Sequence, residues 1–76
     1  MNKLYVFKID VDFGEYVGGV VLDKDIDVAQ VIMMCQIVVN SNKNLGGALP
    51  ITHDSLIFTC NTDKEILSTF IGGYRE

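Results

Sequence analysis

The chain has 76 residues, of which 49% are hydrophobic, and a formal net charge of −4. This length allows a single domain spanning residues 1–76, and the apolar content excludes a disordered chain. Ten acidic against six basic residues argue against nucleic-acid binding through phosphate contacts. Two cysteines are too few for a disulfide scaffold, so we expect free thiols and a cytoplasmic protein.

The N-terminal third predicts a β-hairpin. Residues 4–11 are rich in β-branched and aromatic side chains, with Tyr5, Phe7, Ile9 and Val11 on one face and Lys8 and Asp10 on the other. The segment 12–15 has turn composition, with Gly14 free to adopt positive φ. Residues 16–22 form the second predicted strand, so the two strands are expected to pair in antiparallel fashion.

A helix is predicted over residues 28–40. Asp27 is a good N-cap, and Gln30 stands three residues later as a capping-box partner. The many β-branched residues in this helix lower its intrinsic propensity, so its burial must stabilise it. The residues expected to face the sheet lie in one arc of the helical wheel: Val28, Val31, Ile32, Cys35, Val38 and Val39.

The C-terminal part predicts a loop at 41–54, a third strand at 55–60 and a second helix. The second helix is indicated by a Thr62-x-x-Glu65 capping box, by apolar residues at helical spacing and by Gly72-Gly73 as its end. The expected fold is α+β in the order ββαβα. A right-handed crossover gives a three-stranded antiparallel sheet of order 2-1-3, with both helices packed on one face.

The other side of the helix at 28–40 predicts a contact surface. The helix contains no charged residue, whereas a solvent-facing helix side normally carries several. Either the second helix or the 41–54 loop covers this side, or it is an interface with another copy or with a foreign protein. Methionine is common at adaptable binding surfaces. The candidate interface residues are Ala29, Met33, Met34 and Ile37.

A second candidate contact lies at Tyr16, Gly18 and Gly19. The glycines belong to a strand and match no phosphate-binding loop, so close backbone packing or a β-bulge explains them. The alternative is that they let a ligand or a partner strand approach closely.

No catalytic or metal site is predicted, and no cofactor is expected. Asp23, Asp25 and Asp27 begin like a calcium loop, but the glycine and glutamate that such a loop requires are missing. His53 is the only histidine, and no nucleophile stands in a recognisable relation to it. We therefore expect a protein that is not an enzyme. The uncharged run at 28–39 is shorter than the ~20 residues of a membrane span, so no membrane partner is expected.

The stretch YVFKIDVDFGEYVGGVVLDKDIDVAQVI, residues 5–32, resembles small accessory proteins encoded by bacteriophages and other mobile elements. The resemblance covers about residues 4–34 and contributes no catalytic residue. It implies a host-interaction factor in the host cytoplasm, of a size and composition similar to anti-CRISPR inhibitors of bacterial defence systems.

The sequence therefore favours a small protein-interaction module, acting as a homo-oligomer, on a host protein, or both. In this interpretation it inhibits the host protein by binding, with no direct contact to nucleic acid. The alternative is an oligomer that sequesters a small ligand such as a nucleotide or metabolite, with Tyr16, Gly18 and Gly19 at the rim of its pocket.

Overall fold

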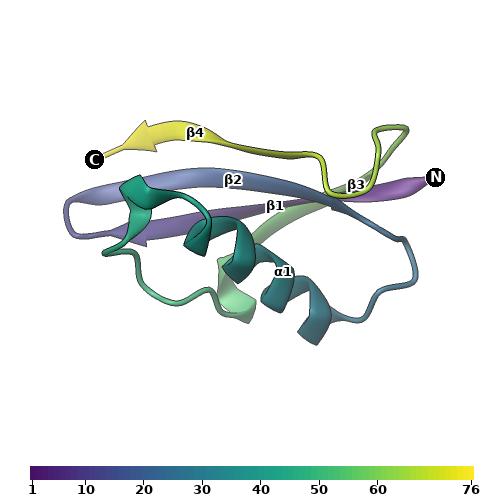
Figure 1. Cartoon of the computed structure of the whole chain (residues 1–76), viewed down its shortest axis with the longest axis horizontal. Coiled ribbons are helices and arrows are strands. Elements are labelled where there is room, and N and C mark those ends of the chain that lie inside the picture. The colour runs from purple at the N-terminus through teal and green to yellow at the C-terminus, as the bar shows by residue number, and fades with distance from the viewer.

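The computed structural model describes all residues from 1 to 76, and it is an α+β fold with one antiparallel sheet and a single α-helix (Figure 1). Two short 3₁₀ turns, η1 and η2, lie between the helix and the third strand. The elements in chain order are β1 (Asn2–Val11), β2 (Gly14–Leu22), α1 (Val28–Asn40), η1 (Lys43–Leu45), η2 (His53–Ser55), β3 (Leu56–Thr62) and β4 (Thr69–Arg75).

The sheet has four strands in the order β3-β1-β2-β4, with every neighbouring pair antiparallel. The order of the three predicted strands, 2-1-3, is confirmed within this sheet. The β1–β2 hairpin is closed by the two residues Asp12 and Phe13, because Val11 pairs with Gly14. Gly14 does not adopt positive φ as predicted. Instead its missing side chain makes room for Tyr74 and Arg75 of β4.

The predicted second helix is wrong, because that part of the chain forms β4. Thr62 does not cap a helix: its hydroxyl accepts a hydrogen bond from the backbone N–H of Lys64 at 3.2 Å, within a turn. A helix here would leave β2 as an unpaired edge, whereas a strand supplies backbone partners along residues 15–20. The β-branched and aromatic residues of β4 suit this extended conformation.

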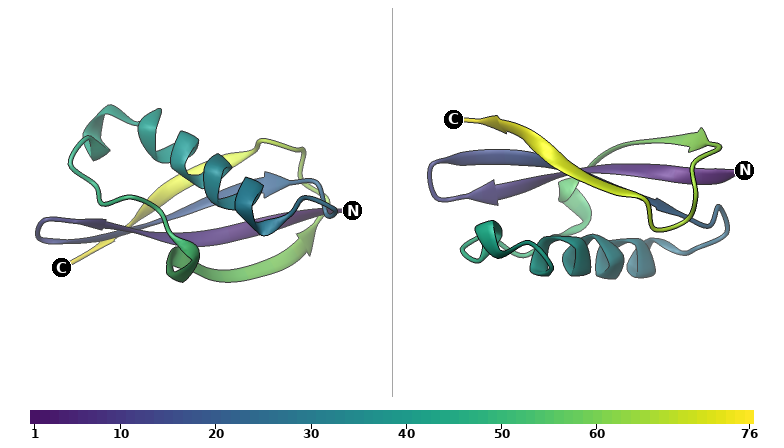
Figure 2. Two further views of the ribbon diagram at one scale, coloured as in Figure 1. Left: turned by 90° about the horizontal axis from the view of Figure 1, so that it is seen from below. Right: turned by 45° about the horizontal axis from the view of Figure 1, so that its top comes forward.

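The helix α1 forms over the predicted residues, and Asp27 is its N-cap. The Asp27 carboxylate accepts a hydrogen bond from the backbone N–H of Gln30 at 3.0 Å. The helix lies across one face of the sheet, and the opposite face carries no helix (Figure 2). Of the predicted inward-facing residues, Val31, Cys35 and Val39 are buried, but Val28 in the first turn is exposed. No helix of the structure could span a membrane.

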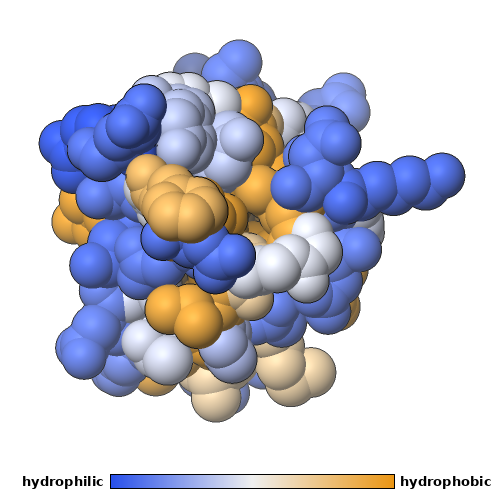
Figure 3. Space-filling view, turned by 90° about the vertical axis from the view of Figure 1, so that its left-hand side faces the viewer, coloured by the Kyte–Doolittle hydropathy of each residue, from blue (hydrophilic) through white to orange (hydrophobic).

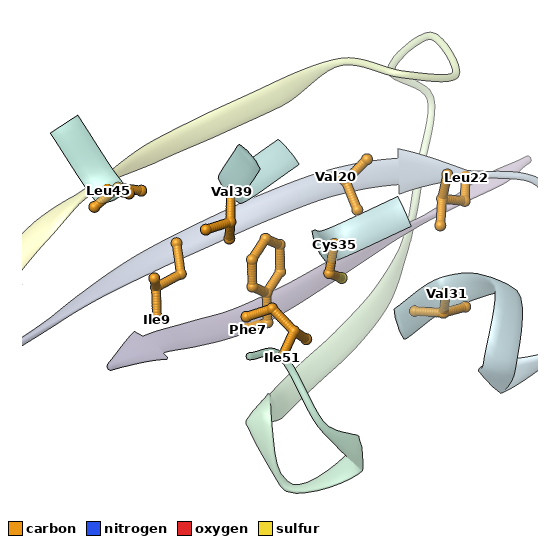
Figure 4. Packing of buried hydrophobic residues seen from close by; sticks show 9 residues of the cluster. All are labelled: Phe7, Ile9, Val20, Leu22, Val31, Cys35, Val39, Leu45 and Ile51. Atoms are coloured by element: carbon orange, nitrogen blue, oxygen red, sulfur yellow. The ribbon is translucent and has the colours of Figure 1, made fainter. Parts of the chain in front are cut away.

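The hydrophobic core lies between α1 and the sheet (Figure 4). Phe7 of β1 is fully buried at its centre and is surrounded by side chains from β2, α1 and the segment 41–55. That segment is a packed connection, because Leu45 and Ile51 both point into the core. Its position is fixed by Gln36, whose side-chain oxygen accepts a hydrogen bond from the Ile51 N–H at 2.8 Å.

Candidate functional site: two apolar surfaces

The outer side of α1 is the first of two apolar surfaces. Met33 is 63% exposed and Ile37 is 50% exposed, Ala29 is exposed as well, and Met34 is half-buried. These are the four residues that the sequence marks as a candidate interface, and they lie at helical spacing along one side. The only polar side chains near them are uncharged, so nothing on the helix opposes contact with another apolar surface.

The chain does not cover this side of α1. The second helix that would have covered it does not exist, and the segment 41–55 packs Leu45, Ala48 and Ile51 against the core instead. Exposed contiguous apolar surface is uncommon on small soluble domains unless it serves a contact. No other part of the same chain shields Met33 and Ile37, so both side chains are available for contact with another molecule.

A groove of about 520 Å³ runs between the C-terminal half of α1 and β4. It arises because β4 extends the sheet by one strand beyond the width that a single helix can cover. Uncharged polar residues border it at Ser41, Asn42 and Thr69. Its apolar walls are Val20, Met34, Ile37, Val38, Leu67, Phe70 and Ile71.

Leu67, in the wall of this groove, has an unusual backbone conformation. Its φ is 71°, the left-handed region that a leucine rarely adopts, and its side chain is 57% exposed. Two hydrogen bonds to β2 hold the segment, because the Leu67 N–H donates to the Val21 carbonyl and the Val21 N–H donates to the Ser68 carbonyl. The start of β4 therefore fixes Leu67 at the edge of the groove.

The second predicted contact, at Tyr16, Gly18 and Gly19, is used for internal packing. Gly18 and Gly19 are both buried, and the rings of Phe7 and Phe70 occupy the space where their side chains would be. Tyr16 is half-buried and packs against Tyr74, with ring centroids 4.9 Å apart. Only Tyr16 of the three therefore reaches the surface.

The predicted β-bulge lies opposite Tyr16 and not at the glycine pair of β2. Between the pairs Glu15–Arg75 and Val17–Gly72, β4 has one residue more than β2. Gly73 at this point has φ of 65°, which glycine adopts without strain. The bulge turns the last residues of β4 so that Arg75 faces Glu15, with 2.9 Å between guanidinium nitrogen and carboxylate oxygen. This hydrogen bond raises the pKa of Arg75.

The second apolar surface is the face of the sheet away from α1, which the sequence analysis did not identify. Strand pairing places one row of residues across all four strands on this face: Phe58 of β3, Val6 of β1, Gly19 of β2 and Phe70 of β4. Phe58 is 55% exposed and Phe70 is 47% exposed. We call the exposed and half-buried apolar residues of this face the open-face patch: Leu4, Val6, Val17, Phe58, Cys60 and Phe70.

The signal for this patch is present in the sequence but is ambiguous there. A sheet with one solvated face alternates apolar and polar residues, and Leu4 and Val6 break that alternation in β1. The β3 residues Phe58 and Cys60 break it as well. Phe70 falls within the predicted second helix, so the sequence does not indicate its contribution to a sheet face.

Polar side chains form no site with clear chemistry. A hollow of about 340 Å³ beside the end of β1 is lined by Lys8, Asp10 and Asp54 among others. No group of three or more histidine, cysteine or acidic residues is arranged to hold a metal ion. His53 is exposed in η2.

At the end of the molecule where the β1–β2 turn lies, apolar and polar groups are interspersed without a single broad apolar area (Figure 3). No protein-family model, no curated protein and no solved structure matches this chain.

Proposed function

We propose that this protein is a small, non-enzymatic protein-binding module, and that its partner docks on the outer side of α1 and the adjoining groove. The observation that carries the proposal is the pair of exposed side chains Met33 and Ile37 on a helix without a single charge. Interface centres are depleted of charged residues and enriched in methionine. The groove beside Ile37 offers a recess for an anchoring side chain of the partner.

The resemblance to phage-encoded accessory proteins also suggests which kind of protein the partner is. We propose a host protein as the target, a defence protein by analogy with inhibitors of similar size, and inhibition by occupation of its surface. The acidic net charge supports a protein partner over nucleic acid.

The test is the double variant Met33→Glu plus Ile37→Lys, which places opposite charges on the docking surface without changing the net charge. Its matched control is Leu49→Glu plus Ile57→Lys, two exposed apolar residues away from α1. Both variants and the unchanged chain would be used to capture proteins from host cells, followed by measurement of affinity for the purified partner.

We expect the Met33/Ile37 variant to lose the partner and the Leu49/Ile57 control to retain it, with circular dichroism showing both to be folded. Equal binding by both variants would contradict the proposed docking surface. Loss of partner binding by the control variant alone would place the docking surface at Leu49 and Ile57 instead.

A second candidate function is binding of a small ligand, such as a nucleotide or metabolite, in the groove. Its volume of about 520 Å³ falls within the range of roughly 300–1,000 Å³ that is typical of ligand sites. A thermal-shift screen of nucleotides and metabolites tests this function, because a ligand at ~100 times its dissociation constant stabilises by about 2.7 kcal/mol. Val38→Trp fills the groove and should abolish any such stabilisation. An empty screen would leave protein binding as the better proposal.

A further inference from the structure

The open-face patch and the surface on α1 lie on opposite sides of the sheet, and they share only Phe70, which borders the groove from the edge strand β4. The patch extends over all four strands, and no helix covers it (Figure 2). Only the connection between β3 and β4 reaches this face. It buries Val21 completely and leaves a small hollow of about 150 Å³ beside Leu4 and Phe70.

The shape of the patch is set by the row Phe58, Val6, Gly19 and Phe70. The ring of Phe70 lies over Gly19 and therefore beside Val6, and Phe58 lies on the other side of Val6. The patch is thus a layer of apolar side chains with two projecting phenylalanines. Layers of this kind are found between the two sheets of a β-sandwich, which pack about 10 Å apart.

The charges of this face are nearly balanced, in contrast to the rest of the protein. The strands place four charged residues on the open face: Lys8, Asp10, Glu15 and Arg75. Two are basic and two are acidic, and the β3–β4 connection at the border of the face adds Asp63, Lys64 and Glu65, so at most one unit of the net charge of −4 lies here. Two copies of an acidic chain can therefore meet on this face with little net repulsion. The same balance argues against a nucleic acid, which would require a basic rim around the aromatic residues.

We propose that the open-face patch is the contact between two copies of this chain, whose sheets pack face to face into a sandwich. Each phenylalanine side chain can bury about 200 Å². Half of that area remains exposed at Phe58 and Phe70, so four rings would remove about 400 Å² from water. Leu4, Val6, Val17 and Cys60 are half-buried and add a smaller area, so the contact is at the lower end of interface sizes and the dimer is expected to be weak.

This arrangement goes beyond the proposed partner binding and is compatible with it. Burial of the two open faces places the helices on the two outer sides of the dimer. Each copy then presents Met33, Ile37 and the groove outward, so one dimer could engage two partner molecules.

The first test is the molar mass in solution, by light scattering, at concentrations up to about 1 mM. The unchanged chain is compared with Phe58→Lys, on the open face, and with Met33→Lys, a matched change on the outer side of α1. We expect a dimer for the unchanged chain and for Met33→Lys, and a monomer for Phe58→Lys. A monomer at all concentrations for the unchanged chain would overturn the proposal, as would a dimer that Met33→Lys dissociates and Phe58→Lys does not.

A second measurement needs no variant and so does not depend on the folding of Phe58→Lys. Cys60 lies on the open face opposite Leu4 and is half-buried in the single chain, whereas Cys35 is buried in the core. The rate at which Cys60 reacts with a disulfide reagent should fall at least tenfold as the protein concentration rises through the dimerisation range. A rate that stays constant while the molar mass doubles would overturn the face-to-face contact.

Loss of partner binding and loss of the dimer can be distinguished in these experiments. The variant Met33→Glu plus Ile37→Lys should remain a dimer, and Phe58→Lys should still bind the partner through α1. Failure of the proposed function would therefore leave the molar mass of the dimer unchanged.

Discussion

The ring of Phe70 occupies the space above Gly19, so that a β-carbon at position 19 would lie 2.6 Å from the ring's Cζ atom. Because Gly19 has no side chain, the Phe70 ring of the edge strand β4 can pack directly against β2. Gly18, the adjacent residue, has the same relation to Phe7 on the other face, where a β-carbon would lie 2.8 Å from Cζ. The two glycines that sequence analysis considered as a contact site therefore shape the packing of both faces of the sheet.

Alanine at these two positions should have unequal effects on stability. Phe7 is fully buried and cannot move, so Gly18→Ala should lower the free energy of unfolding by about 1–3 kcal/mol through overpacking. Phe70 is partly exposed and can swing outward, so Gly19→Ala should cost about 1 kcal/mol or less. Urea denaturation of both variants checks this order, and the reverse order would contradict the assignment of the two faces.

Replacement of Leu67 by glycine should stabilise the protein. Leucine at φ of 71° is strained by about 1–3 kcal/mol, and glycine is not. Because the flexibility of glycine in the unfolded chain offsets part of this gain, we expect Leu67→Gly to raise the free energy of unfolding by about 0.5–1 kcal/mol.

Ile66→Gly is the matched control for Leu67→Gly. Ile66 is similarly exposed but has negative φ, so its replacement should destabilise the protein. Thermal unfolding of both variants distinguishes relief of strain from a general effect of glycine in this turn. Destabilisation by both would argue against strain at Leu67.

Gln36 should be more important for stability than its position near the helix surface indicates. Its side-chain oxygen accepts a hydrogen bond from the partly buried N–H of Ile51, and its side-chain nitrogen donates to Asn40 at 3.0 Å. Gln36→Ala leaves the Ile51 N–H without a partner, so it should cost about 1–3 kcal/mol and speed proteolysis within residues 41–54. Gln30→Ala, on an exposed residue whose side chain makes no hydrogen bond, should have little effect.

The stability of the protein should fall at alkaline pH because of Cys35. Burial raises the pKa of this thiol from its ordinary value of 9.0 to about 11. Since the unfolded thiol ionises first, the contribution is complete below pH 9 and is lost as the pH rises from 9 toward 11. The difference in unfolding free energy between the unchanged chain and Cys35→Ala should shrink over this range. A constant difference would show that Cys35 titrates normally in the folded protein.

The sequence determines the local parts of this fold. Strand patterning, turn composition and an N-cap depend on residues a few positions apart, so the hairpin, Asp27 and the 28–40 helix could be predicted from them. The same periodicity identified Met33 and Ile37 as outward-facing residues. The interpretation of that side as an interface remains a proposal, because the exposure of a side chain does not identify the molecule that binds it.

The conformation of residues 63–75 depends on the tertiary structure and not on local sequence preference. Their apolar spacing and the Thr62 capping signal suit a helix, but the backbone groups along the free edge of β2 require hydrogen-bond partners from a distant segment. Pairing with β2 outweighs the local preference, because it satisfies both strands at once and fits Phe70 against Gly19. The open-face patch depends on the same pairing of β4 with β2. Its side chains come from four strands, and they become neighbours only when strands far apart in the chain pair in the correct register.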